Sequence, residues 1–423
     1  YREYRRRSIL EIWIKDDSFM KHIYLIGNGS RAAQYGVGTY IRQMLEFFRQ
    51  TSSVRLTIVE LNSEVKEVTE ECDNSGKVCY LKIPAQKSEG RKGDVAHCYR
   101  NIAYLLALHF LKDEQNVLHL NYLHHAPLAD WLKKIGVEFY LLVTIHYLDW
   151  CFMLKGNTRL FRSIIHKEEQ SNEWGKKIRN SYERDKRLFQ HSDKVICLSQ
   201  YTQNLLREDY GVEKEKLVVV YNGLKDEAIK LSKEERLEKR SALGFRETDK
   251  IILFVGRLDR IKGVQYLIEA FRQVIRKNPN SRLVIVGDGD YDKYLKQCAG
   301  IWSYVVLTGK VEKEVLYTFY QIADVGVLPS FHEQCSYVAI EMLMHGLPLI
   351  GTGSTGLKEM VEGMHCLPLK EEDDSVDLPI DLLVQWLIED QEHLRSEKYR
   401  RRFEERYTLR KMSENMFSIY LNL

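Results

Sequence analysis

The sequence lacks several features that would assign it to a specialised class of protein. Its 63 basic and 60 acidic side chains leave a net charge of only +3, so no overall electrostatic field would steer nucleic acid toward it. No run approaches the roughly 18 consecutive apolar residues that a membrane-spanning helix needs. No secretory signal pattern opens the chain. We therefore expect a cytoplasmic protein with no nucleic-acid partner.

The eight cysteines lack the spacing of a structural metal site. They form no Cys-x-x-Cys pair and have no compact histidine partner pattern, which argues against structural zinc. In a chain of 423 residues they are typical of small buried hydrophobic side chains in a reducing compartment. We predict no disulfide framework, no metal and a cytoplasmic location.

The composition that is present belongs to an ordinary globular protein, with 44% hydrophobic and 29% charged residues. At roughly 150 residues per domain, the length gives two or three domains. Residues 1–19 precede the first methionine, Met20, and carry four arginines. We treat 1–19 as a basic N-terminal extension outside the fold.

From Met20 onward, short apolar runs alternate with amphipathic segments of helical length, among them Gly38–Gln50, Val95–Lys112 and Phe161–His191. Such alternation predicts a parallel sheet covered by helices on both faces. The series occurs twice, which predicts an α/β chain with two doubly wound domains, 20–223 and 224–400, and a C-terminal helix over 401–423. The predicted strands are His22–Gly27, Val54–Leu61, Val78–Ile83, Asn116–Asn121, Phe139–His146, Lys194–Ser199 and Leu217–Tyr221, then Lys250–Gly256, Arg282–Gly287, Tyr304–Thr308, Ala323–Leu328, Gly346–Gly351 and Cys366–Leu369.

Ligands of open parallel sheets bind at the carboxyl ends of the strands, so residues there are the first candidates for a site. The loop Gly256–Gly263 follows a predicted strand and contains Arg257 and Lys262. A planar guanidinium and an ammonium point charge suit a diphosphate. A solvated basic turn is the alternative interpretation.

Two glutamates, Glu333 and Glu341, flank a predicted helix over Gln334–His345. Glu341 would lie about two turns into that helix, where a carboxylate can hold a ribose diol. Glu333 would lie at the N-terminal end of that helix, where a carboxylate can accept hydrogen bonds from sugar hydroxyls. The alternative for Glu333 is a charge that stabilises the helix dipole.

Two glycine-rich turns, Gly27–Gly38 and Gly351–Gly356, each precede a predicted helix and suit the binding of anions. Gly351–Gly356 does not continue into the Lys-Ser/Thr of a P-loop, so NTPase chemistry is unsupported. Glu60 ends the second predicted strand and could serve a ribose. An NAD- or FAD-dependent oxidoreductase is therefore the alternative from another class.

Taken in their order along the chain, the motifs of this sequence resemble those of the retaining nucleotide-sugar glycosyltransferases of family 4, which have the GT-B fold. The resemblance covers essentially Met20–Leu423 and includes Asn222-Gly223, which is similar to the interdomain Asn-Gly of the family. It implies two Rossmann-like domains that face a central cleft. The remaining matching pieces are Phe254-Val255-Gly256-Arg257, Lys262-Gly263, Val286-Gly287-Asp288-Gly289, Leu307-Thr308-Gly309, Ala323-Asp324-Val325, Pro329-Ser330, Glu333, Glu341, Gly346-Leu347-Pro348 and Gly356–Glu359.

The resemblance also implies a role for each candidate residue. Arg257 and Lys262 would hold the diphosphate, Glu333 the donor sugar and Glu341 the ribose. His146, at the end of a predicted strand, would be a polar group beside the sugar, whereas packing is the preferred interpretation of His119, His124 and His125. The other donor-binding residues would be Gly256 and the first-domain loop glycines Gly36 and Gly38 for close backbone approach, Ser336, Tyr337 and Val338 for main-chain N–H groups, and Val311 for the base.

Transfer in this family is pictured as front-face attack, in which the leaving phosphate helps to deprotonate the acceptor hydroxyl. The resemblance thus implies a metal-independent retaining hexosyltransferase, with UDP- or GDP-hexose as co-substrate and no resident cofactor. The acceptor would be a glycan, a lipid-linked molecule or a peptide. A GT-B nucleotide-sugar epimerase stays open as an alternative. One departure is Gln334-Cys335-Ser336, where the family commonly has Gly-Phe-Gly, so donor specificity would differ.

The segment Phe161–Arg187 mixes basic and aromatic residues and predicts peripheral contact with anionic lipid at the inner face of a membrane. Its acidic residues favour the alternative of a solvated helix face. Near the end, Met412, Met416 and Tyr420 are spaced for one apolar helix face. In the fold that the chain resembles, this last helix crosses back to the first domain.

Overall fold

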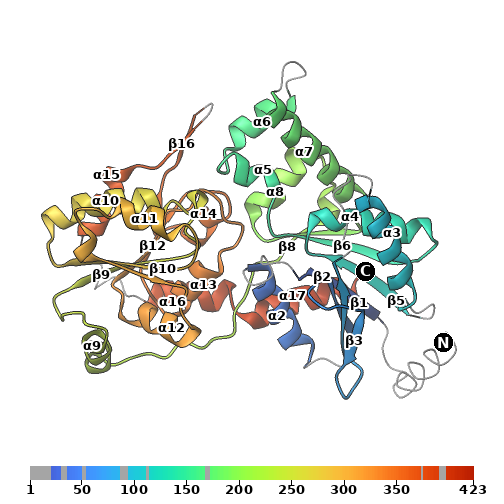
Figure 1. Cartoon of the computed structure of the whole chain (residues 1–423), viewed down its shortest axis with the longest axis horizontal. Helices are drawn as coiled ribbons and strands as arrows, with labels where there is room; N and C mark the ends of the chain where they lie inside the picture. Colours follow the sequence, from blue (N-terminus) through green and yellow to red (C-terminus); the bar gives the residue numbers. More distant parts are fainter. Residues whose placement is uncertain are drawn as a thin grey trace.

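The computed structural model describes residues 21–29, 36–49, 54–85, 94–110, 114–166, 172–372, 375–389 and 397–423. The predicted N-terminal extension, 1–19, lies outside the described residues. Two large sheets lie side by side, each with its own helices (Figure 1). This confirms the α/β class and the prediction of two Rossmann-like units.

The first sheet has eight strands in the order β3-β4-β2-β1-β5-β6-β7-β8. All neighbours are parallel except β3 and β4. Every residue of β1 is buried, as expected for a strand with helices on both faces. The strands are β1 (Lys21–Asn28), β2 (Val54–Ser63), β3 (Thr69–Cys72), β4 (Val78–Pro84), β5 (Gln115–Leu120), β6 (Tyr140–Ile145), β7 (Lys194–Cys197) and β8 (Leu217–Val219).

Helices cover both faces of the first sheet (Figure 1). Ile102, Leu128, Phe189 and Leu205 pack on one face in a single cluster. Side-chain caps fix where some helices begin: Asn172 accepts from Gly175 N, and Ser199 accepts from Thr202 N. The helices are α2 (Gly36–Phe48), α3 (Asp94–Ala107), α4 (Ala126–Lys134), α5 (Asp149–Met153), α6 (Thr158–His166), α7 (Glu173–His191) and α8 (Gln200–Glu208).

The second sheet has six strands in the order β11-β10-β9-β12-β13-β14, all parallel. Its strands are β9 (Lys250–Val255), β10 (Ser281–Val286), β11 (Val305–Gly309), β12 (Val325–Leu328), β13 (Leu349–Thr352) and β14 (His365–Leu367). Its helices are α9 (Lys233–Ala242), α10 (Val264–Lys277), α11 (Tyr291–Gln297), α12 (Lys313–Ile322), α13 (Tyr337–Met344), α14 (Leu357–Met360), α15 (Ile380–Ile388) and α16 (Glu397–Arg406).

A short antiparallel hairpin that the sequence did not predict, β15 (Lys370–Glu371) and β16 (Val376–Asp377), extends from the second sheet. The buried side chain of Asn157, just before α6, donates to the carbonyls of Glu372 at 2.7 Å and Ser375 at 3.2 Å. The hairpin of the second unit therefore contacts the first unit through Asn157.

The C-terminal helix α17 (Leu409–Leu421) returns to the first sheet, as predicted. Met412, Met416 and Tyr420 are buried against the same cluster as Met44 of α2. The Tyr420 hydroxyl lies 2.5 Å from Nδ1 of His119 in β5. Figure 1 shows α17 beside α2 on the face of the sheet opposite α3.

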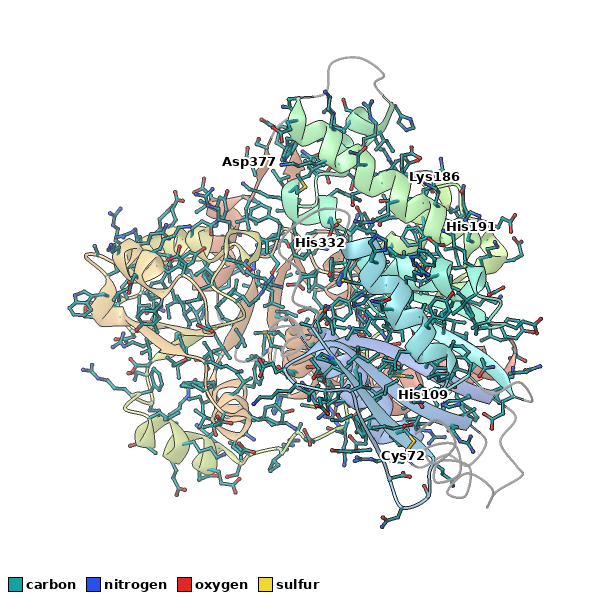
Figure 2. The ribbon with its side chains drawn as sticks, turned by 45° about the vertical axis from the view of Figure 1, so that its right-hand side comes forward. Cys72, His109, Lys186, His191, His332 and Asp377 are labelled. Atoms are coloured by element: carbon teal, nitrogen blue, oxygen red, sulfur yellow. A yellow bond between two sulfur atoms is a disulfide. The ribbon has the colours of Figure 1, made fainter. Side chains whose placement is uncertain are left out.

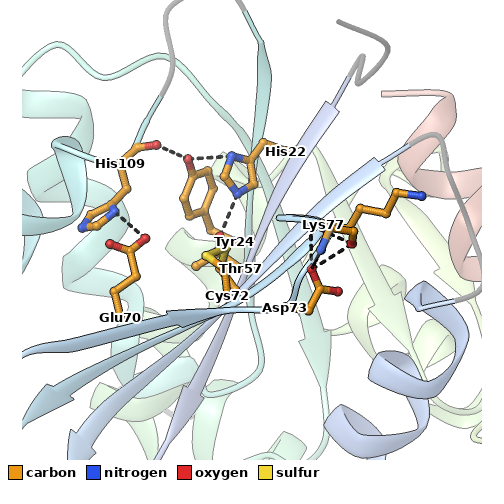
Figure 3. The surroundings of a disulfide bond; sticks show 10 residues. His22, Tyr24, Thr57, Glu70, Cys72, Asp73, Lys77 and His109 are labelled. Carbon is orange, nitrogen blue, oxygen red and sulfur yellow. Dashed lines mark hydrogen bonds and ion pairs between the residues drawn. A yellow bond between two sulfur atoms is a disulfide. The ribbon is translucent and has the colours of Figure 1, made fainter. Parts of the chain in front are cut away.

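The prediction of buried cysteines in a reducing compartment is wrong for one pair. Cys72 and Cys79 form a disulfide between β3 and β4 (Figure 3). The two residues are direct cross-strand partners with Cα atoms 4.0 Å apart. The sequence pattern missed this pairing because β3 is short and largely exposed, so no apolar run marks it. The other six cysteines are free.

The basic segment divides into α6 and α7, with 167–171 outside the described residues. Two of its arginines have acidic partners: Arg162 lies 2.8 Å from Asp209, and Arg184 lies 2.8 Å from Asp185 and 3.2 Å from Asp149. These pairs favour a solvated charged face, and membrane contact stays a prediction. Among the described helices, none is long and apolar enough to cross a bilayer.

Substitution of Tyr420 should strongly destabilise the first unit. Its side chain is fully buried and bonded to His119, so Tyr420→Ala should lower the free energy of unfolding by about 3–5 kcal/mol. Leu421→Ala, at a side chain that is 42% exposed, is the matched control and should change it little. Urea denaturation monitored by circular dichroism measures both. Equal losses in the two variants would contradict this packing.

Candidate active site

The candidate site lies at the carboxyl ends of three adjacent strands, β9, β12 and β13. The loop after β9 contains Lys262, and the loop after β12 contains Glu333. Lys262 Nζ lies 2.5 Å from Glu333 Oε1, and these side chains are only 20% and 11% exposed. The structure therefore brings together the cation and the carboxylate that the sequence placed at separate strand ends.

Arg257 lies on the same loop but is more exposed. Its side chain is 43% exposed and contacts Asp259 at 3.1 Å. Asp259 also caps the short 3₁₀ turn Arg260–Lys262, since its carboxylate accepts from Lys262 N at 3.1 Å. Asp259 thus fixes the backbone that carries both predicted phosphate ligands. The loop places the guanidinium where a solvent-borne anion can reach it.

The glycine-rich turn Gly351–Gly356 supports the Glu333 loop. Thr355 Oγ1 donates to Glu333 O at 2.6 Å and accepts from Glu333 N at 3.0 Å, and Gly356 N donates to the same carbonyl at 2.8 Å. A Cβ on Gly356 would lie 1.8 Å from Gln334 O. Thr355 and Gly356 therefore have a structural role, and the binding of an anion at this turn stays a prediction.

Helix α13 begins at Tyr337, so the predicted start at Gln334 is wrong. Ser336 is the N-cap, and its hydroxyl accepts from Ala339 N at 3.4 Å, so the helix begins three residues later than the apolar pattern suggests. The amides of Tyr337 and Val338 belong to the first turn, where N–H groups have no partner within the helix. The amide of Ser336, also a predicted phosphate ligand, already donates to Met360 Sδ at 3.3 Å.

Glu341 lies on α13 and faces α12. The Tyr320 hydroxyl donates to Glu341 Oε2 at 2.6 Å. Burial raises the pKa of Glu341 to about 7, although the Tyr320 hydrogen bond opposes this shift. The carboxylate is therefore a poorly solvated acceptor, as its apolar sequence neighbours predicted. Tyr320 was missed because its contact depends on the packing of two helices.

Gly36 and Gly38 belong to the first turn of α2, so the prediction that they form a loop is wrong. A Cβ on Gly36 would lie 3.9 Å from the ring of Tyr337. The N-terminus of α2 in the first unit therefore faces the N-terminus of α13 in the second. Both helix N-termini carry partial positive charge, which favours an anion nearby.

His146 follows β6 and is held by polar and aromatic contacts. Its Nε2 lies 3.0 Å from Asn121 Oδ1, and its ring packs edge-on to Tyr40. Burial lowers the pKa of His146 to about 3, so the ring is neutral near pH 7. Contact with a donor sugar stays a prediction. His119, by contrast, is buried between Tyr420 and Thr144, which confirms its packing role.

His332 is a site residue that sequence reasoning missed. It immediately precedes Glu333, is buried, and packs its ring edge-on to Phe152 of α5. Figure 2 shows it where the second unit meets the first. Its Nδ1 lies 3.3 Å from Thr355 Oγ1, and burial lowers the pKa of His332 to about 4. No spacing rule could have found it, because its partners come from both units.

Two other predicted ligands have different surroundings. Val311, after β11, is partly buried against the core of the second unit. Glu60 is not at the end of its strand, because β2 continues to Ser63, whose hydroxyl donates to Glu60 Oε1 at 2.5 Å. The oxidoreductase alternative thus loses its strand-end ribose ligand.

Glu341 makes the stability of the protein depend on pH. Its folded pKa of about 7 exceeds the model-compound value of 4.5, so the folded state binds more protons than the unfolded state between these pH values. The stabilisation by this proton is present below pH 4.5 and is lost as the pH rises through 7. Glu341→Gln should therefore gain melting temperature relative to wild type from pH 5 to pH 8. Glu362→Gln, at an exposed glutamate, is the control, and a pH-independent difference for Glu341→Gln would contradict the assignment.

Comparison with known proteins finds two family models. The one described as Glycosyltransferase Family 4 matches residues 35–228, and the one described as Glycosyl transferases group 1 matches residues 249–383. An uncharacterised glycosyltransferase of Methanocaldococcus jannaschii is 35% identical over 176 residues, 40% of this chain and 45% of that protein. The alpha-monoglucosyldiacylglycerol synthase of Streptococcus pneumoniae is 32% identical over 182 residues, 41% of each chain. The matched region thus spans less than half the length of either relative.

Solved structures match over nearly the whole chain. Sucrose-phosphate synthase from Thermosynechococcus elongatus has a TM-score of 0.72 at 20% identity, covering 95% of this chain and 98% of that chain. Anabaena HepE, solved in complex with UDP and glucose, has a TM-score of 0.69 at 16% identity, covering 96% and 100%. These likenesses concern the fold. With the two family models, which together match most of the sequence, they establish that the chain belongs to the family 4, group 1 glycosyltransferases and has the GT-B fold.

Proposed function

We propose that this chain transfers a hexose from a UDP- or GDP-hexose donor to an acceptor hydroxyl with retention of the anomeric configuration, in the synthesis of a cell-surface glycan or glycoconjugate. The observation that carries the proposal is the Lys262–Glu333 ion pair of 2.5 Å at the strand ends. Arg257 lies on the same loop as Lys262. A cation pair for phosphates thus adjoins a carboxylate for sugar hydroxyls.

The ion pair suggests how the donor would enter. In the free protein Lys262 and Glu333 neutralise each other. A diphosphate would take over the ammonium of Lys262 and release the Glu333 carboxylate to accept hydrogen bonds from the donor sugar. Charge-assisted hydrogen bonds of this kind contribute about 1.5–3 kcal/mol each. Arg257 and Lys262 would then stabilise the negative charge that grows on the leaving phosphate as the glycosidic bond breaks.

The remaining contacts with the donor follow from the same arrangement. The ionised form of Glu341 would accept hydrogen bonds from the ribose diol, with Tyr320 holding its carboxylate in place. The first-turn amides of Tyr337 and Val338, facing Gly36, would lie near the phosphates. Neutral His146 would supply a hydrogen bond to the sugar without adding charge.

The proposed reaction needs no metal and no resident cofactor. Among the described residues, the compact group of histidine, cysteine and acidic side chains is Glu70, Cys72 and Cys79, and its two sulfur atoms are joined in the disulfide and supply no thiolate ligand. This group lies on β3 and β4, outside the candidate site. The leaving phosphate would act as the base for the acceptor, so paired acid and base side chains are not required.

We propose only the chemical class of the acceptor, which would be a glycan, a lipid-linked molecule or a peptide. The Streptococcus pneumoniae relative is named as a synthase of a glucosyl lipid, which supports testing lipid acceptors first. Peripheral attachment to the inner face of a membrane through α6 and α7 would suit such an acceptor.

Thermal-shift titration tests the donor class most directly. UDP or GDP should raise the melting temperature in a concentration-dependent manner, because a ligand that binds only the folded state stabilises it. NAD, the matched control, should not. Stabilisation by NAD alone would refute the proposal. With an active donor and acceptor, proton NMR of the product reads the anomeric configuration, and turnover of the nucleotide sugar without acceptor would favour the epimerase alternative.

Arg257 should matter for the transfer rate. Arg257→Ala should lower kcat on the order of 10²–10³-fold, the usual effect of removing one preorganised group that stabilises developing charge. Arg260→Ala, at an exposed arginine three residues further along the same loop, should retain wild-type kcat. Steady-state assays with a labelled sugar nucleotide measure both variants. Equal kcat values for the two variants would remove Arg257 from the mechanism.

A further inference from the structure

The two units are in contact next to the Glu333 loop. Gln334 of the second unit contacts Ser199 and Thr202 of the first, and Glu359 of the second unit contacts the main chain at the start of α8. We refer to Gln334, Glu359, Ser199 and Thr202 as the interdomain clasp. No part of the proposed reaction uses them. Their arrangement nevertheless connects the first unit to the backbone of Glu333.

Glu359, in the short helix α14, binds the N-terminus of α8. Its carboxylate accepts from Gln200 N at 3.0 Å and from Tyr201 N at 2.7 Å, and the Tyr221 hydroxyl donates to it at 3.1 Å. The two amides belong to the first turn of α8, so they have no partner within the helix. An anion at this position also gains from the helix dipole. Glu359 therefore links the units through charge-assisted hydrogen bonds.

Gln334 makes the second link. Its buried side-chain oxygen accepts from the Ser199 hydroxyl at 3.3 Å and from the Thr202 hydroxyl. Ser199 is itself the N-cap of α8, so both links hold the same helix end. Gln334 stands where the family commonly has glycine, and this substitution now has a physical role. Nearby, Asn222 Nδ2 donates to the Cys335 carbonyl at 2.7 Å.

The clasp is rigidly joined to Glu333. Thr355 and Gly356 hold the peptide of Glu333 through three hydrogen bonds, and Glu359 follows Gly356 by three residues. The close approach of Gly356 to Gln334 O leaves no room for the two segments to slide. A displacement of α8 would therefore shift the segment 355–359 and, with it, the carboxylate of Glu333.

We infer that Glu359 is a positioning residue: its contact with α8 couples the engagement of the first unit to the placement of Glu333 against Lys262. The inference rests on the proposed function, because it assigns to Glu333 a part in transfer. The side chains proposed to hold the diphosphate and the ribose, Arg257, Lys262 and Glu341, all belong to the second unit. Loss of the clasp should therefore slow transfer without weakening the binding of the nucleotide.

Kinetics of clasp variants test this inference. Glu359→Ala should lower kcat about tenfold while the KM for the donor changes less than about twofold, as expected when a reacting group is misplaced. Glu359→Gln, which keeps an oxygen acceptor, should recover part of the loss. Calorimetric affinity for UDP or GDP should equal that of wild type in both. Glu362→Ala, an exposed glutamate three residues further on, is the matched control and should retain wild-type kcat.

Thr202→Val breaks the clasp from the first unit and should lower kcat in the same direction, which keeps the test decisive if Glu359→Ala fails to fold. Wild-type kcat in both Glu359→Gln and Thr202→Val overturns the inference. A raised KM with intact kcat overturns it as well, since that result assigns Glu359 to donor binding. A wild-type protein that transfers no sugar and binds no nucleotide refutes the proposed function itself, which is a distinguishable failure.

Discussion

The candidate site depends on the close approach of two turns of the second unit. Gly356 lies so near the Gln334 carbonyl that a Cβ there would stand 1.8 Å from the oxygen, a distance that only glycine tolerates. This approach lets Thr355 and Gly356 bond the peptide of Glu333. The Glu333 carboxylate is then directed at Lys262. The orientation of the central ion pair thus depends on a residue that has no functional group.

The two glutamates of the site have different surroundings, which give their carboxylates different properties. Glu333 lies against an ammonium, whereas Glu341 lies against the phenol of Tyr320, and burial raises its pKa to about 7. Environments of this kind let similar side chains act differently at one pH. Glu333 is suited to exchange one charged partner for another. Glu341 is suited to accept hydrogen bonds from neutral hydroxyl donors, because the partner that contacts its carboxylate is the neutral phenol of Tyr320.

Much of this arrangement could be predicted from the sequence. Apolar runs of strand length identified every strand of the two large sheets except β3, and the rule that parallel strands share one carboxyl edge brought Lys262 and Glu333 together correctly. The pattern missed β3 and its disulfide because exposed strands carry no apolar signal. It placed the start of α13 too early because the cap, Ser336, follows residues that are also compatible with a helix. It could not assign partners to Tyr320, His332 or Glu359, because these partners are set by tertiary packing alone.

The return of α17 to the first sheet has a consequence for how the protein is made. The face formed by Ile23, Leu25 and Met44 is covered by Met412, Met416 and Tyr420, so the cover of the first core is encoded at the far end of the sequence. During synthesis, the strands of the first sheet emerge long before that cover exists. The second unit must therefore be translated while an apolar face of the first is still open to water, and the first unit reaches its final packing only after the second has left the ribosome.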